Sequence, residues 1–210
     1  MPATRPAGLA PVAVWSALLY AACLVLLTLL AGAATPGYSH AAQFISELGA
    51  RGALHEAPVR FAGFLPAGVF LLLYCCAAWR VLPRSGALTL AMAGLALYAL
   101  GYLAAAAMPC DPGCRPQQPS LSQVIHNALG LVGYLAAPGF LFLLGHQARA
   151  WPGARLLVVL GYAGGAIALA GLLTLSPASP YAGLSQRAIE GAVLAWVLAS
   201  ARFLRRRAGA

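Results

Sequence analysis

Charge is scarce in this sequence, and lysine is absent. Only four residues are acidic, Glu47, Glu56, Asp111 and Glu190, against thirteen arginines, and charged residues make up 8% of the 210. A soluble domain carries about 25% charged residues, so this scarcity argues against one. The net charge of +9 does not indicate nucleic acid, because the arginines stand at the ends of apolar runs and form no patch with aromatic side chains. We expect no nucleic-acid partner.

Motifs that hold metals or nucleotides are also missing. The chain has no glycine-rich phosphate loop after a strand, no CxxC pair of zinc-ribbon spacing, and no HxxxH or HxxE pattern. A zinc site needs three or more ligands with workable spacing. We therefore predict neither a metal ion nor a cofactor.

The sequence is instead rich in long apolar runs. Hydrophobic residues make up 61% of the chain, and they form runs of about twenty residues, the length that crosses a bilayer. We predict an all-α integral membrane protein, a single domain in which six transmembrane helices form a bundle. The expected spans are residues 12–34, 59–81, 86–108, 121–145, 154–175 and 184–204.

Local signals refine these spans. The first run ends in Ala31-Gly32-Ala33, which is typical of a signal-peptidase site, but it is longer than the roughly 7–15 residues of a signal core. We therefore expect an uncleaved first helix. Pro66 should kink the second span. Gly161 and Gly165 form a GxxxG face that favours close helix packing.

The polar stretch between the first two runs predicts one further helix. Ser39 is a suitable N-cap and Gly49 a suitable stop, and the apolar and polar residues between them fall on opposite faces. We expect a short outer helix that lies in the membrane interface, apolar side down, and presents Ser46 and Glu47.

The arginines give the orientation. One side of the expected bundle carries nine and the other carries four, and positive charge marks the cytoplasmic side. Both termini should therefore be cytoplasmic, which places all four acids on the outer side. The nine are Arg5, Arg80, Arg84, Arg149, Arg155, Arg202, Arg205, Arg206 and Arg207, and the four are Arg51, Arg60, Arg115 and Arg187.

Three short patches carry a family resemblance. They are Ile45–Ala50 with the later Pro58 and Phe61, Met108–Asp111 followed by His126, and Gly183–Arg187. In this order between six apolar runs, they resemble the bacterial and archaeal polytopic membrane family catalogued as domain of unknown function 998. The resemblance implies a six-helix integral membrane protein and carries no established activity. We expect the protein in the bacterial inner (plasma) membrane. The pair Cys110 and Cys114 is not part of it.

The outer loops hold the candidate chemistry. Asp111 and His126 flank a polar, proline-broken segment, and Glu47 lies on the expected outer helix. These three are the candidate catalytic residues, because a general base or a ligand set uses such groups. The alternative is structural, with Asp111 capping a turn and His126 bonding to the start of its helix.

A second group lies on the sixth span. Arg187 and Glu190 are one turn apart, so they either pair with each other or Glu190 points into the bundle toward His126 or Asn127. We predict that His126 and Glu190 share an outer cavity with Arg187, roofed by the Ser46–Glu47 helix and the Asp111 loop. The candidate binding residues are Ser46, Asn127, Arg187 and Glu190.

Cys110 and Cys114 are expected to form a structural disulfide, because an outer loop faces an oxidising compartment. Redox use is the alternative, but no second outer pair of cysteines is present to relay electrons.

Two functions remain open from the sequence. In one, an extracytoplasmic pocket binds or processes a membrane lipid or other amphiphile. In the other, the protein is a non-catalytic membrane scaffold or a small transporter component whose polar residues tie the outer loops together. Inner-side polar residues that would continue a path across the bilayer are lacking, which disfavours a lone channel.

Overall fold

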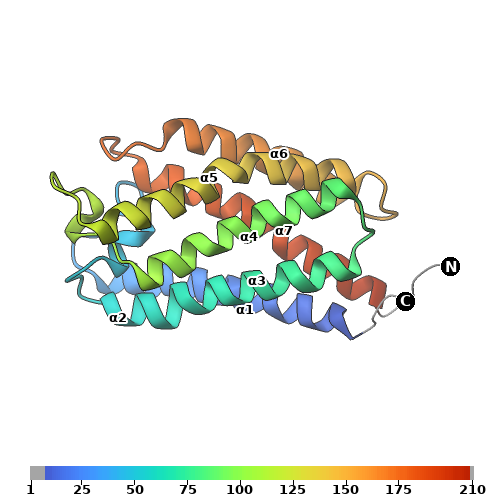
Figure 1. Cartoon of the computed structure of the whole chain (residues 1–210), viewed down its shortest axis with the longest axis horizontal. Helices are drawn as coiled ribbons and strands as arrows, with labels where there is room; N and C mark the ends of the chain where they lie inside the picture. Colours follow the sequence, from blue (N-terminus) through green and yellow to red (C-terminus); the bar gives the residue numbers. More distant parts are fainter. Residues whose placement is uncertain (1–7, 209–210) are drawn as a thin grey trace.

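Six long helices run up and down in the computed structural model, which describes residues 8–208 (Figure 1). No β-strand occurs within that range. Arg5, which entered the charge count, lies outside it. The long helices are α1 (Leu9–Ala34), α3 (Leu65–Val81), α4 (Gly86–Ala107), α5 (Leu121–Ala148), α6 (Arg155–Thr174) and α7 (Ala182–Ala208). The short elements are α2 (Glu56–Pro58), the 3₁₀ helices Ile45–Gly49 and Pro112–Cys114, and the π-helix Val59–Phe64.

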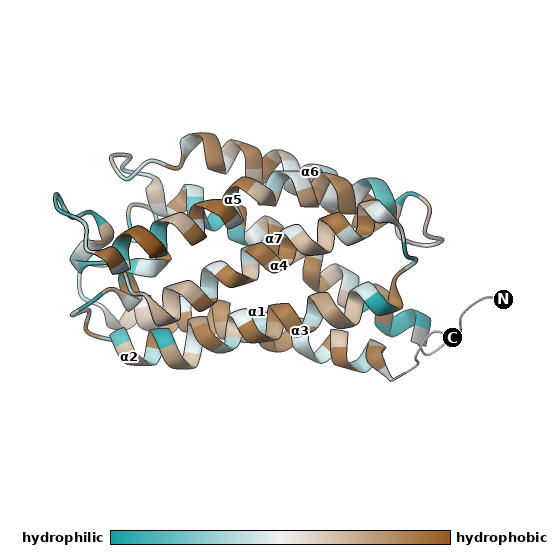
Figure 2. Ribbon diagram, viewed as in Figure 1, coloured by the Kyte–Doolittle hydropathy of each residue, from teal (hydrophilic) through white to brown (hydrophobic). Residues whose placement is uncertain are grey.

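The long helices form a closed ring. Each packs against the helix before and after it in the chain, and α7 packs against both α6 and α1. The core between them is apolar and includes the fully buried side chains of Leu71, Leu95, Leu141 and Trp196. Polar residues gather at the two ends of the bundle (Figure 2). One of these ends, called here the loop end, is formed by residues 35–58, 108–120 and 175–181.

Five of the helices are long and apolar enough to cross a membrane, with α2, the π-helix and α3 counting as one. The sixth, α7, is more polar because its first turns carry Gln186, Arg187 and Glu190 and its last turn carries arginines. The prediction of a helical membrane bundle is therefore confirmed: the chain is a membrane-embedded, all-helical protein.

Pro66 is accommodated by a change of helix type. Proline has no N–H, and inside an α-helix its ring would press on the carbonyl group four residues earlier, here Ala62. The residues just before it, Val59–Phe64, form a π-helix, and α3 continues from Leu65. The wider turns of the π-helix relieve this conflict within a continuous helical segment.

Glycines bring α5 and α6 together. A Cβ atom added at Gly161 would lie 2.3 Å from the Cα atom of Gly145, and one at Gly165 would lie 2.8 Å from the ring of Phe142. No side chain fits at Gly161 without movement of the facing backbone. The GxxxG face of α6 thus packs against α5.

The helix expected between Ser39 and Gly49 is shorter than predicted. Only Ile45–Gly49 is helical, and it is a 3₁₀ helix. The Ser39 hydroxyl accepts from the Ala42 amide, while the Gln43 side chain accepts from the Ser39 amide. These local bonds stabilise a turn in place of the first helical turn. Ile45 and Leu48 are buried, so the segment closes the loop end of the bundle.

Candidate functional site

A cavity of about 350 Å³ lies inside the loop end. Its walls are apolar stretches of α4 and α5, and the start of the 3₁₀ helix Ile45–Gly49 covers it. Asn127, Leu131 and Pro177 line it and are themselves exposed, so the cavity opens between α5 and the α6–α7 loop. Gly130 also lines it, and a Cβ atom added there would meet nothing within 4 Å.

Glu190 lies at the inner end of this cavity and is 6% exposed. Three tyrosine hydroxyls donate to its carboxylate. Tyr98 lies 2.6 Å from Oε2, Tyr134 lies 2.8 Å from Oε1, and Tyr102 also donates to Oε2. The tyrosines come from α4 and α5, so the acid of α7 joins three helices.

The hydrogen bonds continue from Glu190 outward to the 3₁₀ helix Ile45–Gly49. The Ile45 amide donates to Oε1 of Gln186 at 2.6 Å, and Nε2 of Gln186 donates to the Tyr134 hydroxyl at 2.7 Å. On the opposite side, the hydroxyl groups of Tyr20 and Tyr102 are 3.1 Å apart. The network therefore connects α1, α4, α5, α7 and the loop segment around one carboxylate.

Arg187 does not pair with Glu190. Its guanidinium donates to the carbonyls of Gln43 and Gly183, to the Tyr38 hydroxyl at 2.6 Å and to Nδ1 of His40 at 3.0 Å. Burial lowers the pKa of His40, and the charge of Arg187 lowers it further. Arg187 holds the 35–43 loop against α7 and is not among the residues that line the cavity.

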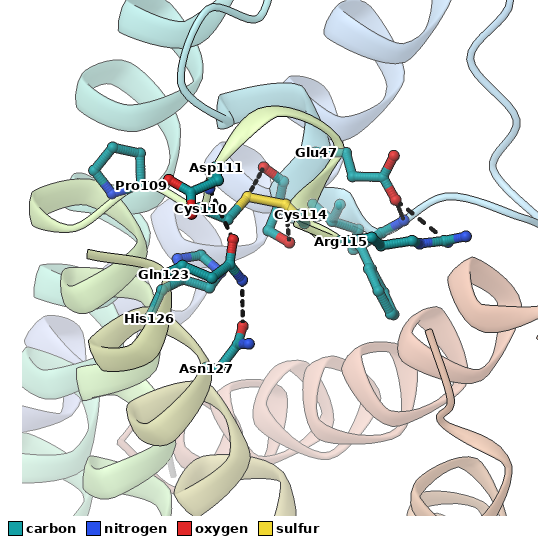
Figure 3. Close-up of a disulfide and its surroundings, with 12 residues drawn as sticks. Glu47, Pro109, Cys110, Asp111, Cys114, Arg115, Gln123, His126 and Asn127 are labelled. Carbon is teal, nitrogen blue, oxygen red and sulfur yellow. Dashed lines mark hydrogen bonds and ion pairs between the residues drawn. A yellow bond between two sulfur atoms is a disulfide. The ribbon is translucent and has the colours of Figure 1, made fainter. Parts of the chain in front are cut away.

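Glu47 is engaged by its own loop. Its carboxylate accepts from the Phe44 amide and from the Gln43 side chain, both at 2.9 Å, and lies 3.5 Å from the guanidinium of Arg115 (Figure 3). Glu47 does not line the cavity, whereas the adjacent Ser46 does.

Asp111 ties its own loop to the start of α5. Its carboxylate accepts from the amide and the hydroxyl of Ser120, at 2.8 and 2.7 Å, and Arg51 lies 3.5 Å away. The Ser120 amide bond is the main reason that the pKa of Asp111 lies below its usual range. Asp111 does not line the cavity, and its carboxylate makes no cap bond to the Pro112–Cys114 turn, so it holds the start of α5 rather than capping that turn.

The sulfur atoms of Cys110 and Cys114 are joined in the structure (Figure 3). Cys114 lines the cavity beside Ser46, whose hydroxyl oxygen is 3.5 Å from the Cys114 sulfur. The Arg51 amide donates to the Cys110 carbonyl at 2.8 Å. This short segment therefore joins the covering loop to the end of α4.

His126 and Asn127 bring polar atoms to the cavity from α5. Nδ1 of His126 is 3.0 Å from the Met108 carbonyl, which only accepts, so this nitrogen carries the proton and Nε2 is left as an acceptor. Oδ1 of Asn127 accepts from Gln123 at 2.8 Å, as Figure 3 shows. The cavity thus includes four of the candidate residues: Ser46, His126, Asn127 and Glu190.

Sequence reasoning missed the tyrosines of α4 and the role of Gln186. Tyr98 and Tyr102 are four residues apart, so they share one face of an otherwise apolar helix. That spacing was a usable signal. Among residues 8–208, no three His, Cys, Asp or Glu side chains are grouped closely enough to hold a metal ion.

A comparison with protein families gives a match to "Protein of unknown function (DUF998)" over residues 14–202. The chain belongs to the DUF998 family. The match includes every residue that lines the cavity and most of all six long helices. It confirms the family inferred from the three sequence patches. No curated protein and no solved structure matches the chain.

Proposed function

We propose that this DUF998 protein crosses the bacterial inner membrane six times, with both termini cytoplasmic and the loop end outside. The short connections that follow α3, α5 and α6 support antiparallel crossings. The greater number of arginines at the opposite end supports the orientation. The polar residues of α7 do not oppose its crossing, because Gln186 and Glu190 are buried inside the bundle.

We further propose that the outer cavity binds a lipid or other amphiphile. The observation that carries this proposal is a cavity with apolar walls and a polar inner end, open beside a membrane-facing helix. Its volume of about 350 Å³ lies within the roughly 300–1,000 Å³ of ligand pockets. A chain entering past Leu131 would contact apolar side chains, while its polar group would reach Glu190.

His126 is the cavity residue best suited to acid–base chemistry on such a ligand. Its Nε2 atom is free to accept a proton, and its Nδ1 proton is fixed by the Met108 carbonyl. Processing of the amphiphile is therefore an extension of the binding proposal, with His126 as the general base. Glu47 and Asp111 would act only by holding the loops that surround the cavity.

The scaffold function is the second candidate, and one observation favours it. Glu47 and Asp111 accept hydrogen bonds within the loop end, and the terminal nitrogens of Arg187 donate to groups there, as expected of residues that tie loops together. In that case the cavity would be empty space between satisfied groups. Substitutions in the cavity wall would then have no effect on ligand retention, because no ligand would be bound.

The experiment is native mass spectrometry of the purified protein and two glycine variants. Gly130→Leu places a side chain in the cavity, whereas Gly139→Leu, on the same helix, also projects into open space but lies outside it. We expect a co-purifying amphiphile with the unmodified protein and Gly139→Leu, and its loss from folded Gly130→Leu. Equal retention by both variants, or no ligand on the unmodified protein, would contradict the proposal.

A further inference from the structure

We infer that the group recognised at the inner end of the cavity is a cation, a protonated or quaternary amine. This inference rests on the proposed function and specifies the head group of the amphiphile.

The four acidic side chains of the protein differ in their partners. Three have an arginine partner: Glu47 lies 3.5 Å from Arg115, Asp111 lies 3.5 Å from Arg51, and Glu56 lies 2.7 Å from Arg60. Glu190 has no ion-pair partner within residues 8–208, although it is buried among the helices of the bundle.

The nearest arginine in sequence does not supply that partner. Arg187 is one turn away on α7, but its terminal nitrogens donate to Tyr38, His40, Gln43 and Gly183. No arginine lines the cavity, and the chain contains no lysine.

The hydrogen bonds of Gln186 set the direction of the tyrosine protons in the network. Gln186 uses Oε1 to accept from the Ile45 amide, so its NH₂ group faces Tyr134 and donates to that hydroxyl. The single hydrogen of Tyr134 is then directed to Glu190. Tyr98 and Tyr102 direct theirs to the other carboxylate oxygen. Three donors facing two oxygens fit an ionised carboxylate, which only accepts.

An ionised Glu190 gives the cavity one negative charge that no arginine among residues 8–208 pairs with directly. A charge held away from water is costly unless it is paired, and hydrogen bonds offset only part of that cost. A ligand with a positive head group would complete the pair, whereas an anionic head group would be repelled.

Aromatic side chains surround the acid. The rings of Tyr98, Tyr102 and Tyr134 line the cavity together with Phe64. The centroid of the Tyr98 ring is 5.8 Å from the centroid of each of the other two tyrosine rings. Aromatic faces attract ammonium groups within about 6 Å, and quaternary ammonium ligands are commonly bound by such clusters. An acid among aromatic rings thus favours an amine over a bare metal ion.

The test measures binding of simple probes to the protein in dodecyl maltoside micelles by isothermal titration calorimetry. The probes are dodecyltrimethylammonium, dodecyl sulfate, uncharged dodecanol and chain-free tetramethylammonium. Gly130→Leu serves as the reference for partition into the micelle. We expect dodecyltrimethylammonium to bind at least tenfold more tightly than the other three.

Two variants then locate the selectivity. Glu190→Gln should bring the affinities for dodecyltrimethylammonium and dodecanol within about threefold of each other. Glu56→Gln removes a carboxylate that is paired with Arg60 at the surface, and it should leave the selectivity intact. The comparison of probes on the unmodified protein remains decisive where Glu190→Gln does not fold.

Each other outcome has a distinct meaning. If dodecyl sulfate or dodecanol binds as tightly as the cationic probe, the amine inference is wrong and the amphiphile proposal stands. If tetramethylammonium binds as tightly as the dodecyl cation, the site recognises an amine and the amphiphile proposal is wrong. If no probe binds better than to Gly130→Leu, both are wrong.

Discussion

His40 and His126 carry their ring protons on different nitrogens, and this difference separates their roles. Nδ1 of His40 accepts from Arg187, so a proton there would break the contact. Nδ1 of His126 instead donates to the Met108 carbonyl, which leaves Nε2 facing away from that bond. One histidine therefore holds a loop, and the other has a free acceptor in the cavity region.

We predict that His40 makes the protein less stable at mildly acidic pH. Burial and Arg187 hold its pKa below the usual value, so below about pH 6.5 the unfolded chain binds more protons than the folded one. Stability should therefore fall as the pH is lowered from 7.5 to 5.5. His40→Asn keeps an acceptor for Arg187 without titrating, and melting temperatures of both proteins at the two pH values provide the measurement.

The other histidines are common to both proteins, so the difference between them isolates His40. On acidification, the melting temperature of the His40→Asn variant should fall less than that of the unmodified protein. An equal loss in the two would show that His40 does not carry the effect.

At this scale the sequence indicated Glu190 but not its partners. The cost of a charge in the bilayer predicts that Glu190 faces the bundle interior. Tyr98 and Tyr102 were not singled out, because tyrosines in apolar runs are also explained by the interfacial belt. Which face of α4 points toward Glu190 depends on packing of the whole ring, and no local pattern encodes it.

Among the elements, α5 and α6 approach so closely that no side chain fits at Gly161. The GxxxG pattern predicted a close-packing face, but it did not identify Gly145 as the facing residue, because the helix crossing point is a tertiary property. The 3₁₀ segment shows the opposite case. Its polar and apolar pattern suited a longer helix, and the competing bonds of Ser39 and Gln43 determined the outcome.

We predict that Gly161→Ala destabilises the fold. The new Cβ atom would lie 2.3 Å from backbone, so α5 and α6 must separate, and overpacking of this kind costs about 1–3 kcal/mol. Gly139→Ala is the matched control on α5, because its Cβ atom meets nothing within 4 Å. Thermal unfolding in detergent should show a lower melting temperature for the first variant and no loss for the second. Equal melting temperatures would contradict the packing described for this face.

A second prediction concerns the segment between α4 and α5. Cys110 and Cys114 should be bonded in protein taken from an oxidising compartment, because both lie at the loop end and their sulfur atoms are in contact. Peptide mapping of denatured protein should find both alkylated only after reduction. Cys76, which is free, should be alkylated with or without reduction. Alkylation of Cys110 and Cys114 without prior reduction would show that the disulfide is absent.

For the whole molecule, the apolar runs and short connections predicted an antiparallel helical bundle. They did not predict that α7 closes a ring with α1. The reason is physical: α7 is the least apolar long helix, and its polar side chains find partners only where several helices converge. Glu190 meets tyrosines from α4 and α5, and Arg187 meets the loop after α1.

The proposed topology predicts the behaviour of reporter fusions. Periplasm-active reporters should work when fused after Arg51 or Gln117, which lie at the loop end. They should fail after Arg84 or Arg149, which lie at the other end. The measurement is enzyme activity normalised to the amount of each fusion. The reverse pattern would overturn the orientation, and activity at all four sites would overturn the six crossings.

The central claim is that the outer cavity holds an amphiphile, and photo-labelling tests it most directly. A dodecyltrimethylammonium probe with a diazirine in its chain would be photolysed with the protein in maltoside micelles, and the labelled residues mapped by peptide sequencing. We expect the label to concentrate on residues 127–134 and 175–177, to be competed by unlabelled probe, and to be lost in Gly130→Leu but not in Gly139→Leu. Label spread evenly over the membrane-facing helices, with the same pattern in both variants, would contradict the account.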